Sequence, residues 1–121
     1  MVNEALFSKV PIGTDWKHFI STKASSSEAA AASYEREMKK FYGAETLDPK
    51  DPFFDIVLLG IGDDGHTASL FPGTPAVKED KAWVTSTSGV KPEPRISLTF
   101  PVLNSSRNVL LLAAGVDGVC A

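Results

Sequence analysis

The sequence predicts an α/β protein with a doubly wound, mostly parallel sheet and flanking helices. Two continuous apolar runs, residues 54–59 and 108–114, are typical of strands that helices cover on both faces of a parallel sheet. Good helix formers fill residues 29–42, and a glycine-rich turn follows the first run at residues 60–65. One long helix is too little to cover two such strands on both faces. We therefore expect residues 1–121 to form a partial single domain with an incomplete sheet.

The composition argues against several classes of partner. A formal net charge of −3 over 121 residues gives no field that would attract nucleic acid or an anionic membrane. The longest apolar run is far shorter than the ~18 residues that a membrane span requires. The first residues lack the pattern of a signal peptide, and the single cysteine, Cys120, cannot form an internal disulfide. We expect neither a nucleic-acid nor a membrane partner, and a reducing, cytoplasmic location.

The elements before the first apolar run are predicted from spacing and turn residues. Apolar side chains at helical spacing predict a short helix over residues 4–10, which Pro11 ends. Residues 16–20 are predicted to form a strand. His18 lies in that strand, and because no acid or second histidine is near it in sequence, we interpret it as a partly exposed strand residue without a functional role.

The long helix is predicted from a start signal, a stop signal and an apolar stripe. Ser25 with Glu28 three residues later resembles a capping box, and residues 29–42 then continue to Gly43. The stripe at spacings of three and four consists of Ala31, Tyr34, Met38 and Phe41. The pattern indicates an ordinary amphipathic helix with a solvated charged face.

Three further segments complete the prediction after the glycine-rich turn. Residues 82–85 are predicted to form a strand, and residues 95–100 alternate with period two, which is typical of a half-buried strand headed by Arg95. The second apolar run, at residues 108–114, is predicted to be a central parallel strand. A turn at residues 115–118 leads away from its carboxyl end.

The turn after the first strand carries the residues that suggest chemistry. Residues 60–65 satisfy G-x-G-x-x-G, but Pro72 leaves no room for the long helix that a dinucleotide-binding turn should open. Asp63, Asp64 and His66 could instead be metal ligands, although one imidazole and two adjacent carboxylates form a weak signature. They could also be ordinary exposed turn residues.

General base catalysis suits the same turn better. The unperturbed pKa of a histidine is about 6.5, so His66 could accept a proton from water near neutral pH, while Asp64 fixes its tautomer. The bare N–H groups of a glycine turn could stabilise an oxyanion that forms on a carbonyl group. The pattern favours a hydrolytic site at the carboxyl end of the first strand.

Residues 59–72, LGIGDDGHTASLFP, resemble the signature of the 6-phosphogluconolactonase family. Residues 92–99, 101–104 and 1–6 are also similar to segments of that family. The resemblance implies the family's Rossmann-like fold, which glucosamine-6-phosphate deaminase shares. It also implies hydrolysis of 6-phospho-D-glucono-1,5-lactone to 6-phosphogluconate in the pentose phosphate pathway, without a metal or organic cofactor. The implied partner is thus a small phosphosugar lactone.

The resemblance also implies roles for individual residues. His66 becomes the general base that activates water, with Asp64 as its partner. Arg95 becomes a candidate phosphate ligand, and the other expected substrate contacts are Gly62, Gly65 and Thr67. The deaminase branch is expected to carry a glutamate five residues after the histidine, where this chain has Phe71. A sugar-phosphate isomerase is therefore the lesser alternative, because Phe71 cannot transfer a proton.

Two departures from the family pattern leave alternatives open. The family's N-terminal half, with its phosphate loop, has no counterpart here, and Gly118 stands where a phosphate-binding lysine is expected. The chain could be a lactone hydrolase whose site is completed by residues outside this sequence. It could also be a non-catalytic α/β fragment that associates with another, complementary chain.

Overall fold

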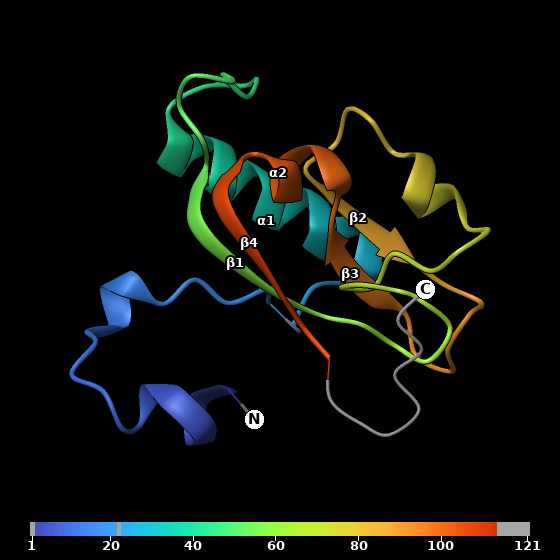
Figure 1. Cartoon of the computed structure of the whole chain (residues 1–121), viewed down its shortest axis with the longest axis horizontal. Coiled ribbons are helices and arrows are strands. Elements are labelled where there is room, and N and C mark those ends of the chain that lie inside the picture. The colour runs from blue at the N-terminus through green and yellow to red at the C-terminus, as the bar shows by residue number, and fades with distance from the viewer. Residues whose placement is uncertain (1, 22, 114–121) are drawn as a thin grey trace.

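A computed structural model describes residues 2–21 and 23–113 (Figure 1). Within these residues, no helix combines the length and the apolar character needed to cross a membrane. The elements in chain order are a π-helix Asn3–Phe7, a 3-10 helix Thr14–Trp16, α1 Ser27–Tyr42, β1 Phe54–Gly60, a 3-10 helix Pro75–Lys78, β2 Val84–Thr87, β3 Arg95–Leu98, α2 Phe100–Asn104 and β4 Ser106–Leu112.

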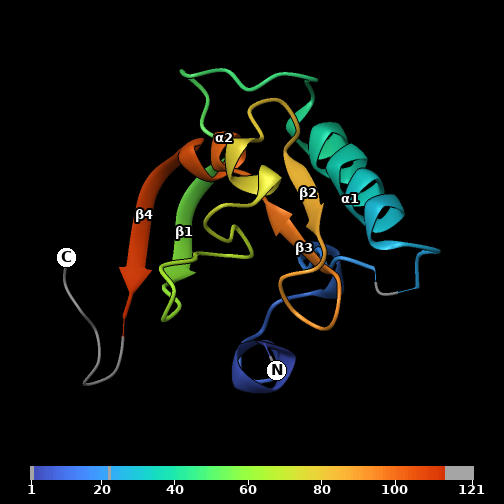
Figure 2. The same ribbon diagram turned by 90° about the vertical axis from the view of Figure 1, so that its right-hand side faces the viewer.

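The described strands form two pairs. β1 and β4 are parallel, in a register that runs from Phe54 opposite Ser106 to Gly60 opposite Leu112. β2 and β3 are antiparallel neighbours joined by a loop, and α1 packs along this second pair (Figure 2). The predicted α/β class is confirmed, and the two apolar runs form a parallel pair as predicted. Their predicted central position is not seen, since in the described part of the chain each pairs only with the other.

Most strand predictions are confirmed with shifted ends. The run at 95–100 gives a shorter strand than predicted, because Phe100 and Pro101 already belong to α2, where proline fits the first turn of a helix. The strand predicted at 82–85 begins two residues later, at Val84. β4 begins at Ser106 and ends at Leu112; the turn predicted at 115–118 lies outside the described residues.

The strand predicted at residues 16–20 is wrong. A 3-10 helix ends at Trp16, and no described strand lies beside the residues that follow, which leaves their backbone without ladder partners. His18 nevertheless has an acidic partner, since its Nδ1 lies 2.7 Å from Glu37 Oε1 on α1. The Tyr34 hydroxyl also donates to the His18 carbonyl at 3.2 Å. These contacts attach the N-terminal segment to α1.

The start of α1 differs from the predicted capping box by one residue. Ser26, not Ser25, is the N-cap, and its Oγ accepts the Ala29 N–H at 3.1 Å. Glu28 does not close a capping box but instead accepts the Ser86 hydroxyl at 3.2 Å, which ties the helix start to β2. Gly43 ends the helix as predicted, at a φ of 82° that favours glycine.

The apolar stripe of α1 forms the main core with β2 and β3. Ala31 and Met38 are buried there, and Tyr34 is half-buried. Phe41, predicted to belong to the same stripe, is 68% exposed and lies at the edge of the helix beside the His18 ring. The other buried members of this core are Trp83, Val84 and Val102.

A second, smaller core lies under the parallel pair and holds the segment after β1. Its buried members are Val57, Leu70, Ala76 and Leu103. The other face of β1 and β4 has no cover among the described residues, and its apolar side chains are exposed. The strands were predicted to be buried on both faces, and they are not. The incomplete sheet that the sequence predicts is confirmed for this part of the chain.

Glu35 fastens α1 to β2, a role that the sequence did not reveal. Its carboxylate accepts the backbone N–H groups of Trp83 at 2.9 Å and Val84 at 3.1 Å. Lys39 Nζ lies 2.9 Å from the other carboxylate oxygen. Burial alone would raise the pKa of Glu35, but the hydrogen bonds from Lys39, Val84 and Trp83 outweigh it, so that the pKa lies below its ordinary value.

Replacing Glu35 is expected to destabilise the chain. Glu35→Ala leaves two N–H groups without acceptors, and we expect the free energy of unfolding to fall by about 1–3 kcal/mol. Lys40→Ala, an exposed change on the same helix, is the control and should have little effect. Urea denaturation measures both. Because the pKa of Glu35 is lowered on folding, its contribution should be lost as the pH falls below 4.5. Equal losses for both variants would contradict this role.

Candidate active site

The residues after β1 form a closed turn at the carboxyl end of the strand. The Gly62 N–H donates to the His66 carbonyl at 2.8 Å, and the Gly65 N–H donates to the Gly62 carbonyl at 3.0 Å. The Thr67 hydroxyl donates to the Gly60 carbonyl at 3.0 Å. The expectation that these glycine N–H groups face a ligand is therefore wrong for Gly62 and Gly65, because both groups already donate within the turn.

Two positions in this turn require glycine, each for a different reason. A Cβ on Gly62 would lie 2.2 Å from both Cε1 and Nδ1 of His66, so the imidazole ring occupies the space that a side chain would need. Gly65 has a φ of 80°, which an L side chain rarely adopts. The glycine motif thus makes room for the ring of His66.

Asp64 holds both the backbone and the ring of His66. Its Oδ1 accepts the His66 N–H at 3.0 Å and forms a short hydrogen bond with Nδ1 of the ring. The hydrogen bond from the ring, followed by the one from the backbone N–H, lowers the pKa of Asp64. With Nδ1–H donating to the carboxylate, a neutral ring carries its free acceptor at Nε2. The His66 side chain remains 22% exposed. This is the arrangement expected of a general base and its orienting acid.

Phe71 fixes the other side of the His66 ring. The two ring centroids are 4.5 Å apart with an interplanar angle of 37°, and Phe71 is buried. Lys91 Nζ lies 5.7 Å from the centroid of Phe71, which brings a cation near the same turn. From the sequence, Phe71 is notable only as a position without a proton donor, and its packing against the imidazole was not predicted. An aromatic residue five positions after the histidine was the available signal.

Ser97 anchors the segment after the turn to β3. Its Oγ accepts the Ser69 N–H at 3.0 Å, and both residues are buried. This contact was not predicted, because nothing in the local pattern distinguishes Ser97 from its neighbours. It joins the turn to the strand that begins at Arg95.

Arg95 lies on the same side of the molecule as the turn but is not joined to it. β1 and β2 end, and β3 begins, at the lower side of Figure 2. Arg95 is exposed, and in the described part of the chain no hydrogen bond or ion pair links it to residues 60–67. The structure thus brings together Gly62, Asp64 and His66.

Two earlier alternatives for the turn do not fit its geometry. A 3-10 helix at Pro75–Lys78, instead of a long helix, follows the turn, which agrees with the argument against a dinucleotide site. Among residues 2–21 and 23–113, no three histidine, cysteine, aspartate or glutamate side chains are grouped as metal ligands. Asp63, Asp64 and His66 therefore do not converge on one point.

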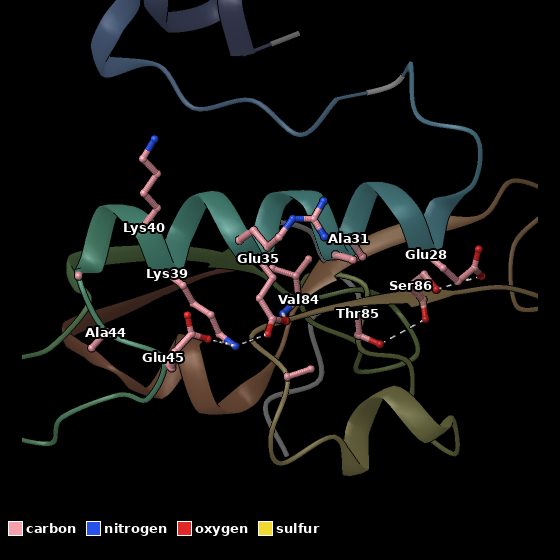
Figure 3. Close-up of a pocket in the computed structure, with 14 residues that line it drawn as sticks. Glu28, Ala31, Glu35, Lys39, Lys40, Ala44, Glu45, Val84, Thr85 and Ser86 are labelled. Atoms are coloured by element: carbon pink, nitrogen blue, oxygen red, sulfur yellow. Dashed lines mark hydrogen bonds and ion pairs between the residues drawn. The ribbon is translucent and has the colours of Figure 1, made fainter.

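A large open hollow of about 770 Å³ lies elsewhere, between α1 and β2 (Figure 3). Lys39 there points toward Glu35 and Glu45 and is paired with both, at 2.9 Å and 3.4 Å. Lys40 points away from it in Figure 3. The charges that line this hollow hold the helix to neighbouring segments. His66 is not among the residues that line the hollow.

Comparison with known proteins decides the family. The family model described as "Glucosamine-6-phosphate isomerases/6-phosphogluconolactonase" matches residues 1–118. The chain belongs to this family. The resemblance of residues 59–72 to its signature is thereby confirmed.

Similar members of the glucosamine-6-phosphate isomerase/6-phosphogluconolactonase family are lactonases by name. The chain is 43% identical over 118 residues to "6-phosphogluconolactonase 3, chloroplastic" of Arabidopsis thaliana, which covers 93% of this chain and 36% of the relative. It is 42% identical over 100 residues to "6-phosphogluconolactonase" of Synechocystis sp., covering 83% of this chain and 40% of the relative. The chain thus spans well under half the length of these curated relatives.

Solved structures of the family agree with the fold. The 6-phosphogluconolactonase of Thermotoga maritima superposes with a TM-score of 0.76 and 36% identity, covering 96% of this chain and 49% of that one. The enzyme of Trypanosoma cruzi gives a TM-score of 0.63 at 31% identity, covering 80% and 40%. The chain therefore folds as about half of a family member.

Gly62→Ala is expected to displace the ring of His66, because the new methyl group would overlap Cε1 and Nδ1. Gly60→Ala is the matched control, since the nearest atom to a Cβ there, the Leu112 carbonyl oxygen, is 4.0 Å away. A long-range ¹H–¹⁵N NMR spectrum of the imidazole should change in the first variant and not in the second. Identical spectra in both variants would disprove the close packing.

His66→Ala should raise the pKa of Asp64 toward its ordinary value of 3.8. The rise should be incomplete, because the backbone N–H of residue 66 still donates to the carboxylate. A ¹³C titration of the carboxyl groups measures it. Glu79 is the internal control, since the N–H groups of Ala82 and Lys81 lower its pKa independently of the turn. The stability that the ring contributes through Asp64 should vanish as the pH falls below 3.8. An unmoved Asp64 titration would refute the pairing.

Proposed function

We propose that this chain carries the catalytic half of a 6-phosphogluconolactonase, which hydrolyses 6-phospho-D-glucono-1,5-lactone to 6-phosphogluconate in the pentose phosphate pathway. The observation that carries the proposal is the pairing of Asp64 with Nδ1 of His66 at the carboxyl end of β1. Ligands of open α/β sheets bind beyond the carboxyl ends of the strands. The lactonase names of the relatives support the substrate class.

His66 acts as the general base in the proposed reaction. Its Nε2 takes a proton from water, and the water oxygen attacks the lactone carbonyl to form a tetrahedral intermediate. The C–O bond of the lactone ring then breaks, and the imidazolium gives its proton to the departing oxygen of the sugar. Asp64 stays ionised and stabilises the imidazolium, since the pKa of Asp64 is lowered by the same ring. General base catalysis of this kind contributes about 10²- to 10⁴-fold.

The remaining site residues are proposed substrate neighbours. Arg95 supplies a guanidinium for the phosphate, on the side of the sheet where the turn lies. Gly65 and Thr67 flank His66 in sequence and border the reacting group, and Gly62 contributes the space that lets the imidazole lie close to the backbone. Charge-assisted hydrogen bonds of the Arg95 type are each worth about 1.5–3 kcal/mol.

An isomerase of the deaminase type is the weaker reading of the same fold. The residue five positions after His66 is Phe71, which is buried against the imidazole and has no proton to give.

A cytoplasmic location also stays a prediction. Several relatives are chloroplastic by name, whereas the name of the Synechocystis relative carries no such label.

The proposal is tested by lactone hydrolysis above the spontaneous rate. His66→Ala should lower the catalysed rate by about 10²- to 10⁴-fold. His18→Ala is the matched control, because His18 also pairs with a carboxylate, Glu37 of α1, yet lies in the segment before α1 and not in the turn after β1. It should leave the rate unchanged. With residues 1–121 alone, equal rates for the unaltered chain and His66→Ala would reject hydrolysis by these residues and favour the non-catalytic fragment.

A further inference from the structure

Lys91 brings a positive charge close to the imidazole of His66. Its Nζ lies 5.7 Å from the ring centroid of Phe71, and that centroid lies 4.5 Å from the ring centroid of His66. The ammonium and the imidazole are therefore at most about 10 Å apart, because both distances are measured to the same ring. The steps proposed for His66 and Asp64 leave this charge without a role.

The Lys91 side chain has hydrogen-bond donors to spare. Within residues 2–21 and 23–113, its ammonium forms no ion pair and no hydrogen bond, whereas Lys39 is paired with two carboxylates. An ammonium has three N–H donors, and the face of an aromatic ring satisfies them only weakly. Lys91 is exposed, so a ligand can reach it. The contact with Phe71 thus holds the side chain near the turn and leaves its donors available.

The loop that carries Lys91 is anchored at both ends and restricted in the middle. It joins β2 to β3, and the residues at its two ends are paired, with Thr87 opposite Arg95. Pro92 fixes its own φ and restricts the backbone of Lys91, the residue before it. A second proline, Pro94, immediately precedes Arg95. The backbone at Lys91 therefore has little conformational freedom to lose when its side chain binds a ligand.

The same loop lies on the side of the molecule that holds the candidate active site. β1 and β2 both end at the lower side of Figure 2, so the turn after β1 and the loop after β2 leave their strands on that side. Arg95 begins β3 four residues after Lys91. Glu93, between them, is exposed and pairs with neither in the described part of the chain. The loop and the start of β3 thus offer an ammonium and a guanidinium, with a positive net charge.

The separation of Lys91 from His66 suits a molecule with a carbonyl group at one end and a phosphate at the other. In the proposed lactone, the reacting carbon and the phosphate are separated by the sugar ring and one methylene group. Such a molecule contacts both residues when its carbonyl faces a water held by His66 and its phosphate faces Lys91. A phosphate monoester carries a charge of about −1.5 to −2 at pH 7, which two cations balance better than one.

We infer that Lys91 is a further substrate-binding residue of the proposed hydrolase, which binds the phosphate of the lactone and selects phosphorylated over unphosphorylated substrates. The inference rests on the proposed function. The Lys91 ammonium donates to a phosphate oxygen, while Arg95 contacts the same group from the start of β3. Phe71 links the two ends of the site, because its ring packs against the imidazole and lies beneath the ammonium.

Binding of 6-phosphogluconate and of gluconate, which differ only in the phosphate group, tests the inference without requiring turnover. Titration of each ligand into the ¹⁵N-labelled chain gives its dissociation constant from NMR shifts. Lys91→Met keeps an unbranched side chain and removes the charge. It should raise the dissociation constant for 6-phosphogluconate by about tenfold or more, because a charge-assisted hydrogen bond is lost. The constant for gluconate should not change.

Two control variants accompany Lys91→Met. Lys91→Arg keeps a positive charge and should retain most of the affinity for 6-phosphogluconate. Lys81→Met is the matched control for the loss of one positive charge, since Lys81 is also exposed but lies before β2, at the opposite end of that strand. It should leave both dissociation constants unchanged. In a lactone hydrolysis assay, Lys91→Met should raise KM and leave kcat unchanged, because the phosphate contact is the same in the ground state and the transition state.

The outcomes separate this inference from the proposed function. A chain that binds neither ligand, or both equally, overturns the inference, and so does an affinity for 6-phosphogluconate that Lys91→Met leaves unchanged. An equal loss in Lys81→Met also overturns it, in favour of an effect of net charge alone. Selective binding that Lys91→Met weakens, without hydrolysis that depends on His66, supports the phosphate contact and counts against hydrolysis by these residues. Hydrolysis that depends on His66, with a KM that Lys91→Met does not change, does the reverse.

Discussion

Hydrogen bonds between β1 and β4 join two segments far apart in the sequence, and they determine where the turn with His66 leaves the sheet. The parallel register carries β1 to Gly60, after which the chain must reverse before Leu70 enters the second core. A short, tightly bonded turn is the result. The imidazole is therefore held at the carboxyl end of a strand by the geometry of the sheet.

Three carboxylates stabilise connections between elements in the same way. Asp64 accepts the N–H of His66, Glu35 accepts those of Trp83 and Val84, and Glu79 accepts those of Lys81 and Ala82. In each case these hydrogen bonds lower the pKa of the acid, so its charge is retained at neutral pH. Asp64 differs because it also holds an imidazole. Asp64 is thereby both an acceptor that stabilises the turn and a member of the candidate catalytic pair.

Sequence patterns predicted correctly those elements whose conformation depends on residues close together in the sequence. The end of α1 at Gly43 follows from its left-handed backbone, and the apolar runs identified β1 and β4. The failures have long-range causes. Residues 16–20 have strand-like alternation but no neighbouring strand, and an extended segment gains its hydrogen bonds only from a partner. The cap moved from Ser25 to Ser26 because neighbouring serines are chemically equivalent as caps and differ only in backbone conformation.

The sequence by itself determined the residue types of the site: a histidine, an acid two positions earlier and glycines around them. Only the tertiary structure decided how they are used. It placed the His66 ring against Gly62 and Phe71, and it directed the N–H groups of Gly62 and Gly65 into the turn. It also left one face of β1 and β4 exposed. The physical reason is that a motif specifies which groups are available, whereas burial and hydrogen-bond partners depend on segments that meet only when the chain folds.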